Sequence, residues 1–122
     1  MNAPLNFHED YLATWTDPDI DQRRHTIEKM WAPDGKLVIS SIGTALRGTA
    51  EISAHITRVH DDMITSKQLT FSYDQQLDAE HALLLRWSMT APSGEVVGRG
   101  VDVVFRDAAG RVETAYMFMG VN

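Results

Sequence analysis

Hydrophobic residues recur at helical spacing in three stretches of the N-terminal half of the chain. Phe7, Tyr11 and Trp15 lie four residues apart, which is the spacing of one face of an amphipathic helix. The same periodicity recurs twice further on, so it predicts three helices, over residues 6–16, 19–31 and 49–64. The third helix has a buried face made of Ile52, Ile56, Val59 and Met63.

The second half of the chain is rich in β-branched and aromatic residues between short turns, which is typical of strands. Turn-forming residues lie at 78–80, 91–94 and 107–110, and such short connections indicate antiparallel hairpins. The predicted strands are residues 67–77, 82–90, 96–105 and 111–121. A further strand is expected at residues 36–42, after a turn at 32–35 and before a loop at 43–48.

This order of elements predicts an α+β fold with three helices on one face of a curved, mostly antiparallel sheet. Such a sheet has to curl around the helices to bury both hydrophobic surfaces, which would leave a cone with a cavity inside. Residues 1–122 fit a single domain. Hydrophobic residues on the opposite face of the sheet would favour a homodimer through that face.

One acidic residue interrupts the most hydrophobic of the predicted strands. Asp102 lies between two valines, and a carboxylate buried there is unfavourable unless it is hydrogen-bonded or protonated. Val101, Val103 and Phe105 share one face of the strand, and Asp102 shares the other with Val104. Alternation alone allows either face to be the inner one, so Asp102 points either to solvent or into the cavity.

Composition excludes several classes of function. The net charge is −6, whereas binding to nucleic acid requires a basic surface. There is no cysteine, which excludes disulfides and thiolate metal sites, and the histidines lack the spacing of metal ligands. The sequence has no secretory signal and no hydrophobic run long enough to span a membrane. We therefore expect a cytoplasmic protein without metal or other cofactor, nucleic-acid partner or membrane association.

The order of elements and four segments resemble a known superfamily. The segments are YLATWTDPDID, WAPDGKL, RGTAEISAHI and GVDVVFRDAAGRVETAYMFM. Together they resemble the nuclear transport factor 2-like (NTF2-like) superfamily, in particular its SnoaL-like and ketosteroid-isomerase-like branch, over about residues 11–120. The resemblance implies a cystatin-like fold, a cone-shaped α+β barrel. It implies no single activity, because this fold carries many functions.

The resemblance also implies a site. Asp102 matches an aspartic acid that ketosteroid isomerases keep protonated and use to donate a hydrogen bond to the substrate oxyanion. Tyr11 matches the tyrosine that completes that oxyanion hole. His55 falls where the family has an aromatic pocket residue. With a pKa near neutrality, His55 is a candidate general base. The predicted catalytic residues are therefore Asp102, Tyr11 and His55.

The sequence departs from this family at the general base. The isomerases have an aspartate at the end of the strand after the second helix, where this chain has Ile39 or Ser40. Neither side chain can remove a proton from carbon, so steroid isomerisation by that mechanism is not expected. The related dehydratases use a second histidine on a following strand, and the segment SKQLTFSY has Gln68 and no histidine.

The remaining predicted site residues are hydrophobic and would contact the ligand. They are Trp15, Trp31, Val59, Met63, Trp87, Val104, Met117 and Met119. Each also has a structural interpretation, because tryptophan and methionine fill hydrophobic cores. Tyr11 could be an ordinary core residue and His55 a packed helix residue. His60 is expected on a solvated helix face, and Gly98 and Gly100 are expected to allow a bend or bulge.

These observations support two hypotheses about function. The first is a protein that binds a small hydrophobic ligand and acts on a carbonyl compound through an Asp–Tyr oxyanion site, as an isomerase, dehydratase or cyclase. Donors of that kind stabilise enolate-like intermediates. The second is a non-catalytic binding module or dimeric scaffold that lacks the general base.

Overall fold

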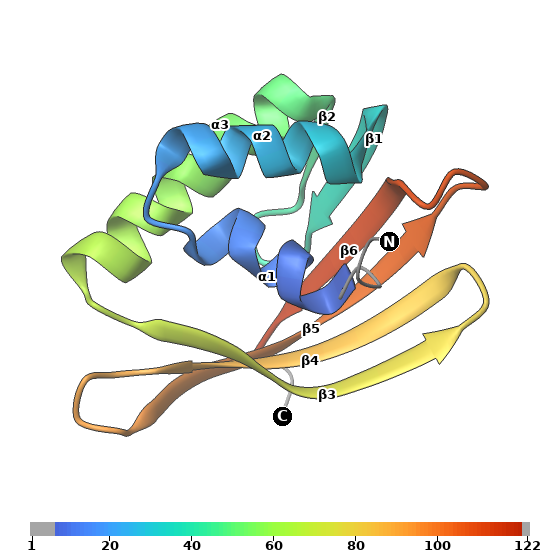
Figure 1. Cartoon of the computed structure of the whole chain (residues 1–122). Coiled ribbons are helices and arrows are strands. Elements are labelled where there is room, and N and C mark those ends of the chain that lie inside the picture. The colour runs from blue at the N-terminus through green and yellow to red at the C-terminus, as the bar shows by residue number, and fades with distance from the viewer. Residues whose placement is uncertain (1–6, 121–122) are drawn as a thin grey trace, which may run out of the picture.

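A computed structural model describes residues 7–120 of the chain as helices on one side of a single sheet (Figure 1). In chain order the elements are α1 (Phe7–Thr16), α2 (Ile20–Met30), β1 (Trp31–Ile39), β2 (Thr44–Arg47), α3 (Thr49–Val59), the π-helix η1 (His60–Ser66), β3 (Thr70–Ala79), β4 (Ala82–Thr90), β5 (Val96–Arg106) and β6 (Val112–Met119). None of the helices in this described part is long and hydrophobic enough to cross a membrane.

The six strands form one sheet in the order β2-β1-β6-β5-β4-β3. β3 to β6 are joined by antiparallel hairpins, and β1 pairs with β6 in parallel. The sheet curves under the three helices and stays open, with β2 and β3 as its edges (Figure 1). The predicted α+β fold, with three helices on a curved and mostly antiparallel sheet, is confirmed.

Local side-chain chemistry explains where the helices begin. The Asp19 carboxylate caps α2 by accepting hydrogen bonds from the backbone N–H groups of Asp21 and Gln22. Gly48 precedes α3 with φ = 86°, a conformation that favours glycine. Gly48 therefore occupies the N-cap position of α3, without a capping side chain.

The first two strands differ from the prediction. β1 begins at Trp31, so the expected turn at 32–35 lies inside the strand as an irregularity, where the pairing with β6 shifts between Trp31 and Lys36. Residues 44–47, expected to be a loop, form the edge strand β2. A β-bulge accommodates Pro33 and Gly35, the two residues that indicate a turn in the sequence.

The third helix also changes character near its end. α3 ends at Val59, and the chain continues directly as the π-helix η1, which has wider turns than an α-helix. His60, expected on a solvated face, is only 5% exposed. Its Nδ1–H donates to the carbonyl oxygen of Trp15 at 2.8 Å, which ties η1 to the end of α1. A buried hydrogen bond between distant segments therefore replaces the expected solvation.

The two faces of the sheet differ in what covers them. Val104 and Ala115 face the helices and join the buried core. Val97, Phe105 and Phe118, on the outer face, are exposed by 50%, 36% and 41%. The Val-x-Val-x-Phe face of β5 is therefore the outer one, and Asp102 faces inward.

Candidate functional site

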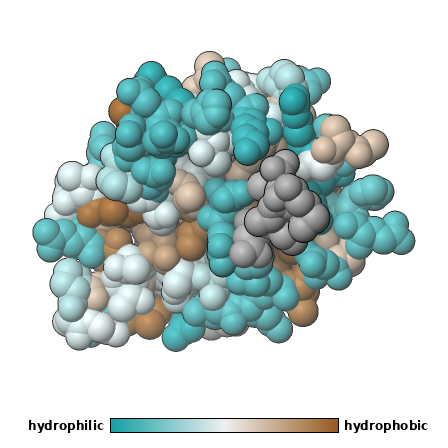
Figure 2. Space-filling view, viewed as in Figure 1, coloured by the Kyte–Doolittle hydropathy of each residue, from teal (hydrophilic) through white to brown (hydrophobic). Residues whose placement is uncertain are grey.

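The helices and the concave face of the sheet enclose a cavity of about 220 Å³. Leu12 and Trp15 of α1, Met63 of η1 and Phe71 of β3 are among its walls. Hydrophobic side chains gather in a hollow at the end of the molecule where η1 leads into β3 (Figures 1 and 2). The volume lies below the range of about 300–1,000 Å³ typical of sites for drug-sized ligands, so the cavity suits a small compound.

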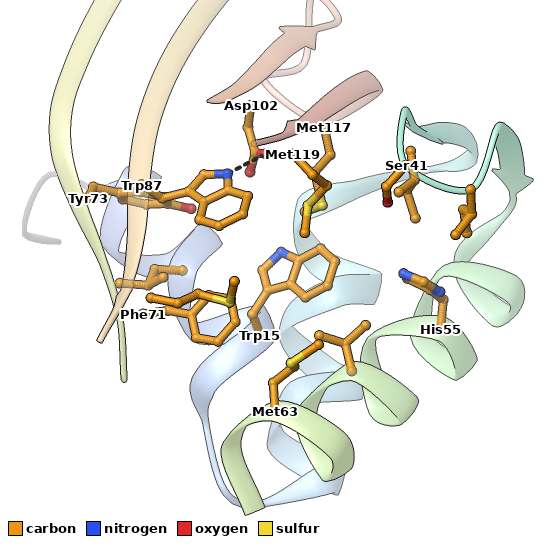
Figure 3. A pocket seen from close by; sticks show the side chains of 15 residues that line it. Trp15, Ser41, His55, Met63, Phe71, Tyr73, Trp87, Asp102, Met117 and Met119 are labelled. Carbon is orange, nitrogen blue, oxygen red and sulfur yellow. Dashed lines mark hydrogen bonds between the residues drawn. The ribbon is translucent and has the colours of Figure 1, made fainter. Parts of the chain in front are cut away.

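Asp102 is the acidic group of this cavity. Its side chain is 3% exposed, and its Oδ1 accepts a hydrogen bond of 3.0 Å from the indole N–H of Trp87 (Figure 3). Burial raises the pKa of Asp102 from 3.8 to about 7, although the Trp87 hydrogen bond lowers it. Near neutral pH the carboxyl group is therefore present both as an acid that can donate a proton and as a carboxylate.

Two tyrosines lie close to Asp102, and only one of them reaches the cavity. Tyr73 of β3 lines it, and burial, followed by the charge of Asp102, raises the pKa of its phenol. The side chain of Tyr11 is fully buried, with Phe7 stacked on it at 5.8 Å between ring centroids. The Tyr11 hydroxyl has no hydrogen-bond partner among the described residues, and burial and Asp102 also raise its pKa. Tyr73 is therefore the phenol that a ligand can contact.

His55 lines a different part of the cavity, near Ser41, with Trp15 and Met119 between it and Asp102 (Figure 3). Its ring packs edge-on against Trp15 at 6.2 Å between centroids. Burial, and secondarily the charge of Arg58, lowers the pKa of His55 below its usual 6.5. The imidazole is therefore neutral at pH 7 and can accept a proton.

The structure brings most of the predicted site residues together. The ones that line the cavity are Trp15, His55, Val59, Met63, Trp87, Asp102, Met117 and Met119. Tyr11, Trp31 and Val104 are not among its lining residues. They lie in the hydrophobic core with 0–1% exposure, because Tyr11 packs between Phe7 and Trp31 while Val104 lies further along β5. A ligand in the cavity would touch the first group and not these three.

Several residues that line the cavity are not among the site residues predicted from the sequence: Leu12, Ile39, Ser41, Ile42, Phe71, Tyr73 and Met89. Tyr73 is the important one, because it places a second hydroxyl donor near Asp102. Alternation with Phe71 is the signal that indicates Tyr73, because both residues line the cavity and lie before the pairing of β3 with β4 shifts between Tyr73 and Gln75. Beyond that irregularity the inward-facing positions change parity.

The position of the family's general base carries no acid or base. Ile39 lines the cavity, and the exposed Ser40 accepts a hydrogen bond at 3.2 Å from the backbone N–H of Met119. Among the described residues, no lysine or arginine lines the cavity. The chemistry available to a ligand is thus a titratable acid with a phenol at one end, a neutral imidazole at the other, and a hydrophobic wall between them.

Comparison with known proteins gives matches to structures only. No family model and no curated protein matches the chain. A candidate isomerase of the SnoaL-like family from Agrobacterium tumefaciens shares 24% identity over 92% of each chain, with a TM-score of 0.81. A candidate SnoaL-like polyketide cyclase from Jannaschia shares 15% identity over 98% of this chain and 90% of that one, with a TM-score of 0.69.

A third match is a protein with a ketosteroid-isomerase-like fold from Catenulispora acidiphila, solved in complex with trimethylamine. It shares 15% identity over 95% of this chain and 86% of its own, with a TM-score of 0.73. At these identities the likeness establishes the fold. The structural neighbours are SnoaL-like, NTF2-like and ketosteroid-isomerase-like proteins, which agrees with the resemblance in the sequence.

Proposed function

We propose that the cavity binds a small hydrophobic carbonyl compound, with Asp102 donating a hydrogen bond to the carbonyl oxygen and Tyr73 as the second donor. The observation that carries this proposal is a buried carboxyl group, with a pKa of about 7, at the end of an otherwise hydrophobic cavity. A protonated acid in such surroundings donates a strong hydrogen bond to an oxygen that gains negative charge.

The reaction class that follows is proton transfer through an enolate-like intermediate, as in isomerisation, dehydration or aldol-type cyclisation. The donors at Asp102 and Tyr73 would stabilise the enolate oxygen. His55, neutral at pH 7, is the group able to take a proton from a ligand carbon at the other end of the cavity. This assignment replaces the aspartate that the family would have near Ile39.

A second candidate function is the binding of a small alkylammonium ion without chemistry. The rings of Trp15, Phe71, Tyr73 and Trp87 line the cavity around Asp102, and aromatic faces beside a carboxylate attract such cations. The trimethylamine complex of the Catenulispora acidiphila protein favours this alternative. It would use Asp102 in its ionised form, whereas a carbonyl ligand uses the protonated form.

The two functions predict opposite dependences of affinity on pH. Affinity for cyclohexanone should fall by about tenfold per unit as the pH rises above 7, because its hydrogen-bond donor is lost. Affinity for tetramethylammonium, whose charge does not titrate, should fall by about tenfold per unit below pH 7. Titration calorimetry from pH 5 to pH 9 measures both.

Asp102→Asn is the matched control, because it keeps a polar side chain of the same shape and removes the titration. In this variant the change in affinity of about tenfold per pH unit around pH 7 should disappear for both probes. Tight binding of cyclohexanone at pH 9 by the wild-type protein would contradict the carbonyl proposal. Binding of tetramethylammonium alone would favour the second function.

We also propose that two copies of the chain pair through the outer face of the sheet, on which Val97, Phe105 and Phe118 are exposed. Phe118 lies directly opposite Val101, and Phe105 packs edge-on against Tyr116 at 6.1 Å, so these hydrophobic side chains form one continuous surface. Light scattering should give a mass twice the 13.7 kDa of one chain. Phe118→Lys should shift the mass to that of one chain, and a monomeric wild-type protein would contradict the proposal.

A further inference from the structure

The indole ring of Trp87 lies over Gly100 of the neighbouring strand β5. Trp87 of β4 pairs with Gly100, while Asp102 pairs with Leu85 two positions along. Trp87 and Asp102 are therefore diagonal neighbours on the inner face of the sheet, where long side chains can meet. The indole N–H reaches Asp102 Oδ1 across this diagonal at 3.0 Å (Figure 3).

Gly100 makes this arrangement possible. A Cβ atom at residue 100 would lie 2.2 Å from Cζ2 and 2.6 Å from Cε2 of the Trp87 ring, closer than van der Waals contact allows. Any side chain larger than hydrogen would lift the indole off the strand and away from Asp102. On the other side Phe71 stacks against Trp87 at 6.1 Å between centroids, so the ring is held from both directions.

The hydrogen bond distinguishes the two oxygens of the carboxyl group. The indole N–H only donates, so Oδ1 must accept from it. When the acid is protonated, its O–H is then best placed on Oδ2. The other titratable groups that the structure places near Asp102 are Tyr11 of α1 and Tyr73 of β3, and both are neutral phenols at pH 7.

We propose that Trp87 is a positioning residue, which holds Oδ1 of Asp102 so that Oδ2 carries the proton and presents it to the ligand, and that Gly100 serves to admit the indole to this place. The proposal rests on the use of Asp102 as the ligand's hydrogen-bond donor. It assigns functions to Trp87 and Gly100 that neither hydrophobic packing nor a strand bend requires.

The test is the titration of the Asp102 carboxyl carbon by ¹³C NMR in the protein without ligand. Trp87→Phe keeps an aromatic ring and removes the indole N–H. The hydrogen bond from that N–H stabilises the carboxylate form of Asp102 in the wild-type protein. The pKa of Asp102 should therefore rise by about one unit above its wild-type value. In the same variant the pH at which cyclohexanone affinity begins to fall should rise by the same amount.

Gly100→Ala tests the second half of the proposal, because it retains Trp87 and displaces its ring. The pKa of Asp102 should rise in this variant as well. The matched control is Gly98→Ala on the same face of β5. A Cβ there would meet Cε of Met89, the flexible end of a side chain, so Asp102 should titrate as in the wild-type protein.

The outcomes separate this proposal from the proposed function. If wild-type Asp102 titrates near 7 and Trp87→Phe leaves that value unchanged or lowers it, the positioning role is wrong and the carbonyl site stands. If wild-type Asp102 titrates near 4, the proposed function is wrong, and the positioning role that rests on it is wrong as well. Should Gly100→Ala not fold, because its Cβ also lies 2.6 Å from the carbonyl oxygen of Phe118, Trp87→Phe alone decides.

Discussion

Between pH 4 and pH 8, the wild-type protein is expected to lose about 4 kcal/mol of stability relative to the Asp102→Asn variant. Burial raises the pKa of Asp102 from 3.8 to about 7, and each unit corresponds to about 1.4 kcal/mol. Within that window the folded protein keeps a proton that the unfolded chain has released. Stability therefore falls as the pH rises, and the loss is complete above about pH 7.

Urea unfolding of both proteins at pH 4 and pH 8 measures this difference. Taking the difference between the proteins removes the contribution of all other titrating groups. Asp78→Asn, at an exposed position of β3, is the matched control and should follow the wild-type protein at both values. If wild-type and Asp102→Asn proteins show the same dependence on pH, Asp102 is not a buried acid with a raised pKa.

Asp102→Leu, which has no hydrogen-bond donor, is expected to slow proton exchange at the α-carbon of a bound ketone by about 10²–10³-fold. This is the usual effect of removing one donor that stabilises an oxyanion. Tyr73→Phe should reduce the rate as well, because its hydroxyl is open to the cavity. Tyr11→Phe should retain a rate near that of the wild-type protein, because its hydroxyl is fully buried in the core.

Deuterium uptake by cyclohexanone in D₂O, followed by proton NMR, measures these rates. His55→Ala should lose about 10²-fold or more if His55 is the general base. Equal rates for wild-type and Asp102→Leu proteins would contradict the oxyanion role. A wild-type rate no faster than that of the buffer, together with tight binding, would identify a binding protein without this chemistry.

Local patterns were sufficient to predict the helices and the last three hairpin-linked strands. The turn residues at 91–94 and 107–110 fall between strands whose bounds differ from the prediction by at most two residues. The start of β1 could not be predicted, because Pro33 and Gly35 indicate a turn, whereas the pairing of Trp31 and Lys36 with β6 on either side keeps them in the strand. Tertiary pairing outweighs local preference there.

In the candidate site, too, local patterns predict some features and tertiary contacts decide the others. Alternation along β5 predicts that Asp102 lies on the other face of the strand from Val103 and Phe105, but it does not indicate which face is the inner one. The family resemblance is what favours the cavity for Asp102. The contact between Trp87 and Asp102 depends on the lateral register of two strands and on the missing Cβ of Gly100. Neither can be read from the periodicity of a single strand.

The central claim is that Asp102 is an acid held in a hydrophobic cavity with its proton available near neutral pH. The most direct measurement is the ¹³C NMR titration of its carboxyl carbon in the wild-type protein. The structure predicts a single titration with a pKa of about 7. A carboxyl group that titrates near 4, as in a solvent-exposed aspartate, would contradict it.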